Sequence, residues 1–113
     1  MADNNFDRNT MLDIFIFETA QLLEQLEEIL LRSEKNDKML PDDIDETFRI
    51  MHTIKGSAAM MAYHNISSVS HAVEDLFEHI RKGQDTDCRG VADIVLSALD
   101  FMKEEIDKIQ AGR

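Results

Sequence analysis

Apolar residues recur every three or four positions in four stretches of the chain, and this spacing predicts four amphipathic helices. The first helix is predicted from Thr10 to Ser33, because Thr10 and Asp13 have the spacing of a capping box. Its apolar positions are Leu12, Phe15, Ile16, Leu22, Leu23, Leu26, Ile29 and Leu30. We expect residues 1–9 to be a flexible lead-in, and the charged, aperiodic stretch Ser33–Leu40 to be a loop.

The second helix is predicted to begin at Pro41 and to run to about Ala62. Proline suits the first helical position because its missing N–H would have no partner there, and the acids that follow favour the positive helix N-terminus. The apolar stripe of this helix consists of Ile44, Phe48, Met51, Ile54 and Ala58. A short connection over residues 63–65 follows, in which Asn65 could cap the next helix.

The third helix is predicted to end at Gly83, because cations followed by glycine are typical of a helix C-terminus. Its apolar positions are Val69, Ala72, Val73, Leu76, Phe77 and Ile80. Asp87 is the predicted N-cap of the fourth helix, whose apolar positions are Val91, Ile94, Val95, Ala98, Leu99, Met102, Ile106 and Ile109. Four such helices with short connections predict an all-α, antiparallel up-down four-helix bundle, a single domain over residues 1–113.

Composition excludes several classes of function. The 113 residues include 12 Lys and Arg against 23 Asp and Glu, a net charge of −11. This charge argues against a nucleic-acid partner and against an anionic membrane surface. The single cysteine excludes an internal disulfide and a cysteine-based zinc site, and it suits a reducing cytoplasm. With no signal peptide and no apolar run of about 20 residues, we expect a cytoplasmic protein that does not insert into membranes.

The residues around His52 in the second helix are unusual for a helix whose only role is to pack in a bundle. His52 lies roughly a right angle from the apolar stripe, so it is predicted to be exposed, with Lys55 and Gly56 beside it one turn on. Glycine inside a helix costs about 1 kcal/mol relative to alanine, which points either to close approach by a partner at Gly56 or to helix packing at Gly56 and Ala59. Met60, near the same face, could contact a docking partner.

Glu74 is the predicted partner of this histidine. A neutral imidazole is a competent nucleophile, and a carboxylate bonded to Nδ1–H leaves the Nε2 lone pair free. His52 lies ten residues, or roughly 15 Å, before the end of the second helix near Ala62. The same distance along the third helix from Ile66 reaches Leu76, which is within one turn of Glu74. His71, one turn before Glu74, lies nearby but points outward. The alternative, a zinc site of His52, His71 and Glu74, lacks the usual ligand pair on one helix.

Residues 48–58, Phe-Arg-Ile-Met-His-Thr-Ile-Lys-Gly-Ser-Ala, resemble the phosphoacceptor helix of histidine phosphotransfer (Hpt) domains. The closest resemblance is to the amino-terminal domains of the CheA family of chemotaxis histidine kinases. It extends to residues 15–31 and to residues 70–76, which contain His-x-x-Glu. The resemblance therefore covers most of the chain and implies the same helical-bundle fold.

The resemblance also assigns roles to residues. It implies that His52 is phosphorylated, that Glu74 orients and polarises it, and that Lys55 and His71 belong to the surrounding polar network. Lys55 would offset the charge of the phosphoryl group. Gly56 matches the small residue that partners approach.

The resemblance implies a phosphocarrier that works with two partners. A separate kinase ATP-binding domain would supply phosphoryl from ATP and Mg²⁺, and an aspartate on a response regulator receiver domain would accept it. The chain has no Gly-x-x-x-x-Gly-Lys loop, so we expect it to bind no cofactor or metal and to lack an ATP site. CheA domains often have a fifth helix, which we expect either to be absent here or to lie beyond Arg113. The alternatives are a free-standing Hpt phosphorelay protein and a helical docking module that is not phosphorylated.

Overall fold

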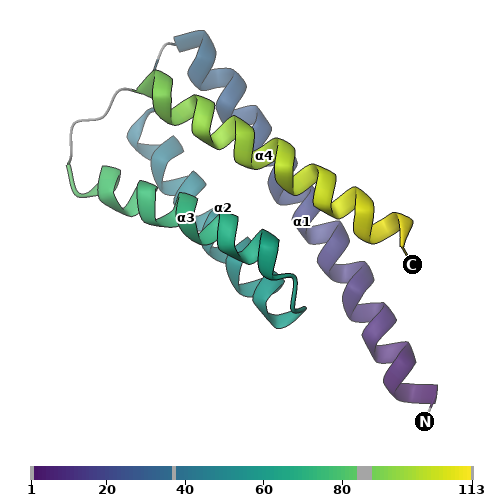
Figure 1. The fold of residues 1–113 in the computed structure, drawn as a ribbon. Coiled ribbons are helices and arrows are strands. Elements are labelled where there is room, and N and C mark those ends of the chain that lie inside the picture. The colour runs from purple at the N-terminus through teal and green to yellow at the C-terminus, as the bar shows by residue number, and fades with distance from the viewer. Residues whose placement is uncertain (1, 37, 84–87, 113) are drawn as a thin grey trace.

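The computed structural model describes residues 2–36, 38–83 and 88–112 of the chain. Within them it contains four helices and no strand: α1 (Ala2–Asn36), α2 (Pro41–Met60), α3 (His64–Arg81) and α4 (Cys88–Ala111). Figure 1 shows α2 and α3 as a hairpin and α4 running along α1, with the N-terminal part of α1 projecting beyond the other helices. The predicted all-α, antiparallel four-helix bundle is confirmed.

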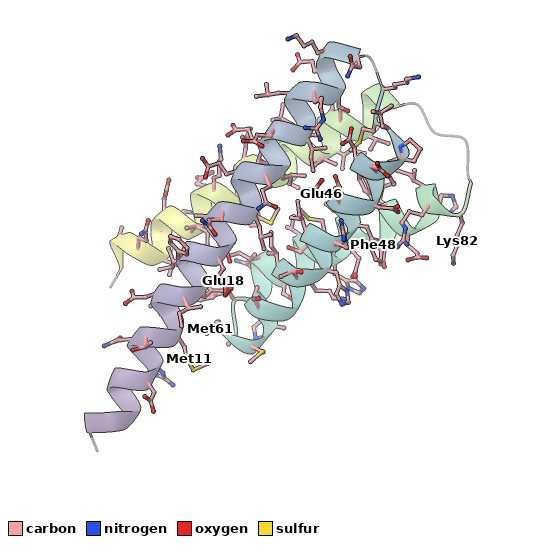
Figure 2. All side chains as sticks on the ribbon, turned by 180° about the vertical axis from the view of Figure 1, so that it is seen from behind. Met11, Glu18, Glu46, Phe48, Met61 and Lys82 are labelled. Atoms are coloured by element: carbon pink, nitrogen blue, oxygen red, sulfur yellow. The ribbon has the colours of Figure 1, made fainter. Side chains whose placement is uncertain are left out.

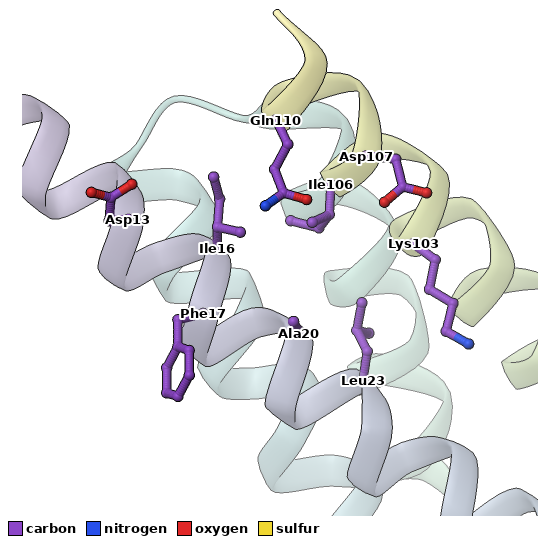
Figure 3. A pocket seen from close by; sticks show the side chains of 9 residues that line it. All are labelled: Asp13, Ile16, Phe17, Ala20, Leu23, Lys103, Ile106, Asp107 and Gln110. Carbon is purple, nitrogen blue, oxygen red and sulfur yellow. The ribbon is translucent and has the colours of Figure 1, made fainter. Parts of the chain in front are cut away.

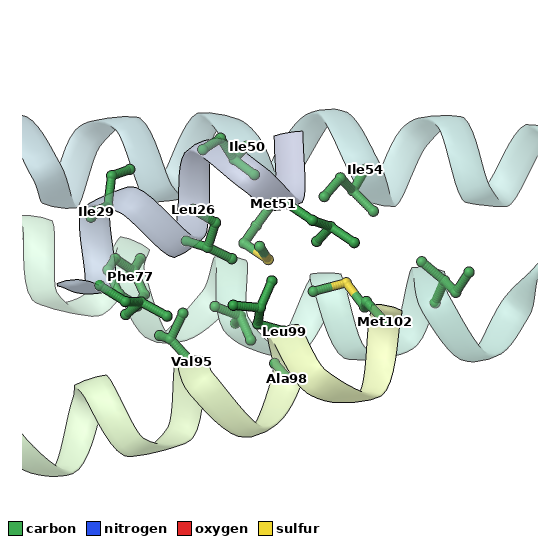
Figure 4. Packing of buried hydrophobic residues seen from close by; sticks show 14 of the residues in the cluster. Leu26, Ile29, Ile50, Met51, Ile54, Phe77, Val95, Ala98, Leu99 and Met102 are labelled. Carbon is green, nitrogen blue, oxygen red and sulfur yellow. The ribbon is translucent and has the colours of Figure 1, made fainter. Parts of the chain in front are cut away.

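The core is formed by the apolar stripes of all four helices (Figure 4). Burying one leucine-sized side chain contributes roughly 1.5–3 kcal/mol, so these stripes hold the helices in a fixed register. The largest fully buried apolar side chains are Leu26, Ile29, Met51, Ile54, Ile66, Phe77, Val95, Leu99 and Met102. Two predicted core positions are wrong: Ile94 is 52% exposed and Ala72 is exposed, because both lie at the edge of their stripes.

The predicted start of the first helix is wrong. Helix α1 begins at Ala2, so residues 2–9, expected to be a flexible lead-in, are helical, and Thr10 lies inside the helix rather than at its cap. This stretch contains no glycine or proline, and extending an existing helix requires the ordering of only one residue for each new hydrogen bond. The same helix continues to Asn36, which shortens the predicted loop at Ser33–Leu40. The predicted cap Asp87 lies outside the described residues.

The turn between α2 and α3 differs from the prediction in one detail. Helix α2 ends at Met60, and α3 begins at His64, so Asn65 lies inside α3 and does not cap it. Ala62 adopts a left-handed conformation with φ 65°, and its N–H donates to the carbonyl of Ala59 (3.1 Å). The N–H of Tyr63 donates to the carbonyl of Ala58 (2.8 Å). These two bonds form a Schellman motif, which reverses the chain tightly and sets the register of α3 against α2.

The end of α3 follows the prediction. Lys82 is the C-cap, and Gly83 has φ 86°, a left-handed conformation that glycine adopts without steric cost. Among the described helices, none combines the length and the apolar character that crossing a lipid bilayer requires.

Candidate functional site

His52 presents its imidazole on the surface of α2. Its side chain is 63% exposed, as predicted, although its neighbour Met51 is fully buried in the core. Nδ1 is hydrogen-bonded to Oε2 of Glu74 on α3. Because an ionised carboxylate can only accept, Nδ1 carries the proton, and Nε2 holds the lone pair of the neutral ring. Among the described residues, none forms a hydrogen bond to Nε2, and most of the side chain is exposed.

Glu74 is a buried carboxylate held between two donors. Its side chain is only 8% exposed, and its second oxygen, Oε1, accepts a hydrogen bond from Nζ of Lys55 at 2.6 Å. Burial alone would raise the pKa of Glu74, but the hydrogen bonds from Lys55 and His52, together with the positive charge of Lys55, outweigh burial and lower the pKa. Glu74 is therefore ionised at neutral pH and can support positive charge on the imidazole.

Lys55 links the two helices of the hairpin twice. Its ammonium is bonded to Glu74, and its backbone carbonyl accepts a hydrogen bond from the hydroxyl of Ser67 on α3 (3.2 Å). The sequence singled out Lys55 for its position beside His52 but not for this bond to Glu74. Ser67 was missed because its contribution depends on the register across the hairpin.

His71 is not part of the hydrogen-bonded group. Its Nε2 lies 3.5 Å from Oδ2 of Asp75 on the same helix, and within the described part of the chain no hydrogen bond joins it to His52 or Glu74. Three positions along a helix turn a side chain by about 60°, so Glu74 points into the bundle while His71, 59% exposed, points outward. The described residues also hold no group of three His, Cys, Asp or Glu side chains suited to a metal ion. The alternative zinc set is therefore not brought together.

The sequence that carries this site matches a known family. The model of the Hpt domain matches residues 10–112, which include the whole hairpin that carries His52 and Glu74. The chain belongs to the Hpt domain family.

Related proteins narrow the type of Hpt domain. The chain is 39% identical over 102 residues to the chemotaxis protein CheA of Treponema pallidum, and 37% identical over 100 residues to that of Borreliella burgdorferi. These matches cover 90% and 88% of the chain but only 12% of each relative, so the chain spans about an eighth of their length. A solved structure, the CheA phosphotransferase domain from Thermotoga maritima, superposes with a TM-score of 0.78 at 30% identity, covering 87% of this chain and 92% of that one. The chain is a histidine phosphotransfer domain of the CheA type.

The surface beside His52 in this Hpt domain is open. Beyond its chain neighbours and the nearby backbone of α2, a methyl group added to Gly56 would meet no atom within 4 Å, so packing against another helix does not require glycine there. Ala59 is exposed as well, which makes the packing interpretation wrong for both residues. Met60 is 79% exposed. Gly56, Ala59 and Met60 follow His52 by four, seven and eight residues, so they share one face of α2 with it.

Two further residues of the Hpt domain reach the site without having been assigned to it from the sequence. The ring of Phe48 lies nearly parallel to the His52 ring, with 6.3 Å between centroids and 13° between planes. The guanidinium carbon of Arg81 lies 4.3 Å from the centroid of the Phe48 ring. Figure 2 shows Phe48 on the same side of the molecule as Lys82, the C-cap of α3. The spacing of four residues between Phe48 and His52 could have predicted their contact, because such residues are neighbours on a helix surface. Nothing in the sequence of α3 predicts that Arg81 contacts Phe48.

A separate groove lies between α1 and α4 (Figure 3). Its volume is about 520 Å³, and it is lined by Asp13, Ile16, Phe17, Ala20, Leu23, Lys103, Ile106, Asp107 and Gln110. None of these residues belongs to the site at His52.

Proposed function

We propose that His52 accepts a phosphoryl group from ATP held by a separate kinase domain and passes it to an aspartate of a response regulator receiver domain. One observation carries the proposal: Glu74 occupies Nδ1 of an exposed imidazole and leaves Nε2 as the nucleophilic atom. The membership of the Hpt family and the likeness to CheA proteins support the same chemistry. ATP and response regulators are found in the cytoplasm, so we propose that the domain works in the cytoplasm.

The first transfer is a displacement at phosphorus. The Nε2 lone pair attacks the γ-phosphorus, a P–N bond forms, the bond from phosphorus to the β–γ bridging oxygen breaks, and ADP leaves. The ring gains positive charge while Nδ1–H stays bonded to Glu74, whose negative charge stabilises the product and the transition state. In the second transfer a carboxylate oxygen of the receiver aspartate attacks phosphorus, the P–N bond breaks, and neutral His52 returns.

The neighbouring residues support both steps in this proposal. Lys55 carries positive charge one turn from His52 and offsets the charge of the phosphoryl group. The open face at Gly56, Ala59 and Met60 lets either partner bring its reacting group to Nε2. ATP and Mg²⁺ belong to the kinase domain, so this domain serves as a phosphocarrier, and its parent protein is a histidine kinase of the CheA type.

The test offers this chain as the substrate of the ATP-binding domain of a CheA protein. That kinase domain is first shown to be active by its labelling of its own phosphotransfer domain. With γ-labelled ATP and Mg²⁺, we expect an acid-labile, alkali-stable label on the wild-type chain and none on His52→Gln. The matched control is His79→Gln, which removes an exposed histidine of α3 that has no assigned role at the site and should keep the label. Full labelling of His52→Gln overturns the assignment. Binding of a receiver domain that survives in His52→Gln, without any phosphohistidine in the wild type, favours the docking module instead.

A further inference from the structure

Glu74 and Phe48 restrain the imidazole of His52 in different ways. Glu74 holds one atom, Nδ1, through a hydrogen bond. A bond at a single atom leaves the ring able to rock about that bond, and most of this side chain faces solvent. The ring of Phe48, one turn earlier on α2, lies nearly parallel to the imidazole at 6.3 Å, within the range of offset stacking. This second contact restrains the plane of the ring.

Phe48 is itself held by Arg81. The guanidinium lies over the Phe48 ring at 4.3 Å, a cation–π contact. Two ion pairs fix the guanidinium: Nε lies 3.0 Å from Oδ1 of Asp45 on α2, and Nη1 lies 3.8 Å from Oε2 of Glu78 on α3. Arg81 therefore connects the last turn of α3 to α2 and packs against the Phe48 ring, which in turn stacks on His52.

We propose that Phe48, held in place by Arg81, is a positioning residue that fixes the plane of the His52 imidazole so that Nε2 points at the incoming phosphorus. The inference rests on the proposed function and adds a second restraint to the one that Glu74 supplies. Nucleophilic attack needs the lone pair aligned with the bond that breaks, so a ring that rocks spends less time in the reactive orientation.

The test uses phosphoramidate, a small phosphoryl donor that needs no kinase. Nε2 attacks its phosphorus, a P–N bond forms to the histidine, the P–N bond of the donor breaks, and ammonia leaves. The variants are Phe48→Leu, which removes the ring, Phe48→Tyr, which keeps it, and Arg81→Met, which removes the cation. Arg49→Met is the matched control, since it removes the same charge from an exposed position of α2.

Two quantities are measured, the rate of labelling at His52 and the NMR shifts of its ring protons. In Phe48→Leu we expect a rate lower by roughly threefold to tenfold and the loss of the ring-current shift that a stacked aromatic produces. Phe48→Tyr should retain both properties. Arg81→Met should lower the rate by about twofold relative to Arg49→Met. It should also change the NMR shifts of the His52 ring protons, whereas the loss of a charge in Arg49→Met should leave these shifts unchanged.

The outcomes separate this inference from the proposed function. If the wild type is labelled at His52 and Phe48→Leu reacts within twofold of it with unchanged ring shifts, the positioning role is wrong and the phosphoacceptor role stands. If the wild type is not labelled at His52 by either donor, the proposed function itself fails. Should Phe48→Leu not fold by circular dichroism, Arg81→Met decides: ring shifts and a rate equal to those of Arg49→Met overturn the inference.

Discussion

The ammonium of Lys55 on α2 lies 2.6 Å from the carboxylate of Glu74 on α3, and this contact keeps a buried carboxylate ionised directly beside His52. An unpaired carboxylate in that position would be destabilised by desolvation and would tend to take up a proton. A neutral Glu74 could not balance the positive charge that phosphorylation creates on the imidazole. The ion pair thus connects the packing of the hairpin to the chemistry of its surface.

Replacing Glu74 with glutamine should slow phosphorylation of His52 by the kinase domain by roughly tenfold or more. A hydrogen bond to a charged group contributes about 1.5–3 kcal/mol, and about 1.4 kcal/mol of transition-state stabilisation corresponds to a factor of ten. The amide keeps an acceptor for Nδ1–H but removes the charge. Initial rates of labelling from γ-labelled ATP measure the effect.

The matched control for Glu74→Gln is Asp75→Asn, which neutralises the next residue along α3. The side chain of Asp75 is 71% exposed and pairs with His71 rather than with His52. Its rate should stay within about twofold of the wild type, because exposed ion pairs contribute little. Equal rates for Glu74→Gln and Asp75→Asn, with both variants folded by circular dichroism, would show that the buried carboxylate does not assist the transfer.

Stability should depend on pH through Glu74 with a defined sign. The fold lowers the pKa of this group below its ordinary value of 4.5, so the unfolded chain binds the proton more readily. The stabilisation from Glu74 is therefore complete above that value and is lost as pH falls through the lower pKa of the folded state.

Urea unfolding of the wild type and of Glu74→Gln between about pH 6 and pH 3 tests this sign. The wild type should lose its advantage in the free energy of unfolding over the variant as the solution becomes more acidic. Glu24→Gln, a replacement at an exposed position of α1, controls for the general effect of removing one acid. A difference between wild type and Glu74→Gln that stays constant with pH contradicts the lowered pKa.

Substitution of Gly56 should separate stability from partner approach. Gly56→Gln replaces a poor helix former with a good one, and the Cβ enters open space, so the free energy of unfolding should rise by about 0.5–1 kcal/mol. Labelling by the kinase domain should nevertheless fall, because the larger side chain stands beside His52 where the partner approaches. Labelling by phosphoramidate, a much smaller donor, should change less.

Gly90→Gln is the control for this experiment, since Gly90 also faces open space but lies on α4. It should leave labelling by the kinase domain unchanged. If Gly56→Gln and Gly90→Gln are labelled equally fast by the kinase domain, the open face at Gly56 has no role in partner approach.

The sequence predicted what depends on local periodicity. The start of α2 at Pro41 and the exposure of His52 follow from spacing along one helix, and Glu74 could be placed opposite His52 by counting along two arms of a hairpin. The burial of Glu74, its bond to Lys55 and the contact of Arg81 with Phe48 depend on how α3 is rotated against α2. No periodicity within either helix specifies that rotation, so these features required the structure.

The turn at Ala62 sets the register that brings Glu74 to His52. A left-handed conformation costs an L-residue with a Cβ roughly 1–2 kcal/mol, and the Schellman motif requires it here. Ala62→Gly should therefore raise the free energy of unfolding by about 1 kcal/mol, or the melting temperature by roughly 4 °C.

The control for Ala62→Gly is Ala59→Gly, the same exchange at an exposed position inside α2, which should lower the free energy of unfolding by about 1 kcal/mol. Opposite signs at two positions three residues apart can only reflect their backbone conformations, since the side chain removed is identical. Labelling of Ala62→Gly at His52 should match the wild type, because glycine preserves the turn and hence the distance from Glu74 to His52. A loss of stability in Ala62→Gly comparable to that of Ala59→Gly would mean that this turn is not left-handed in solution.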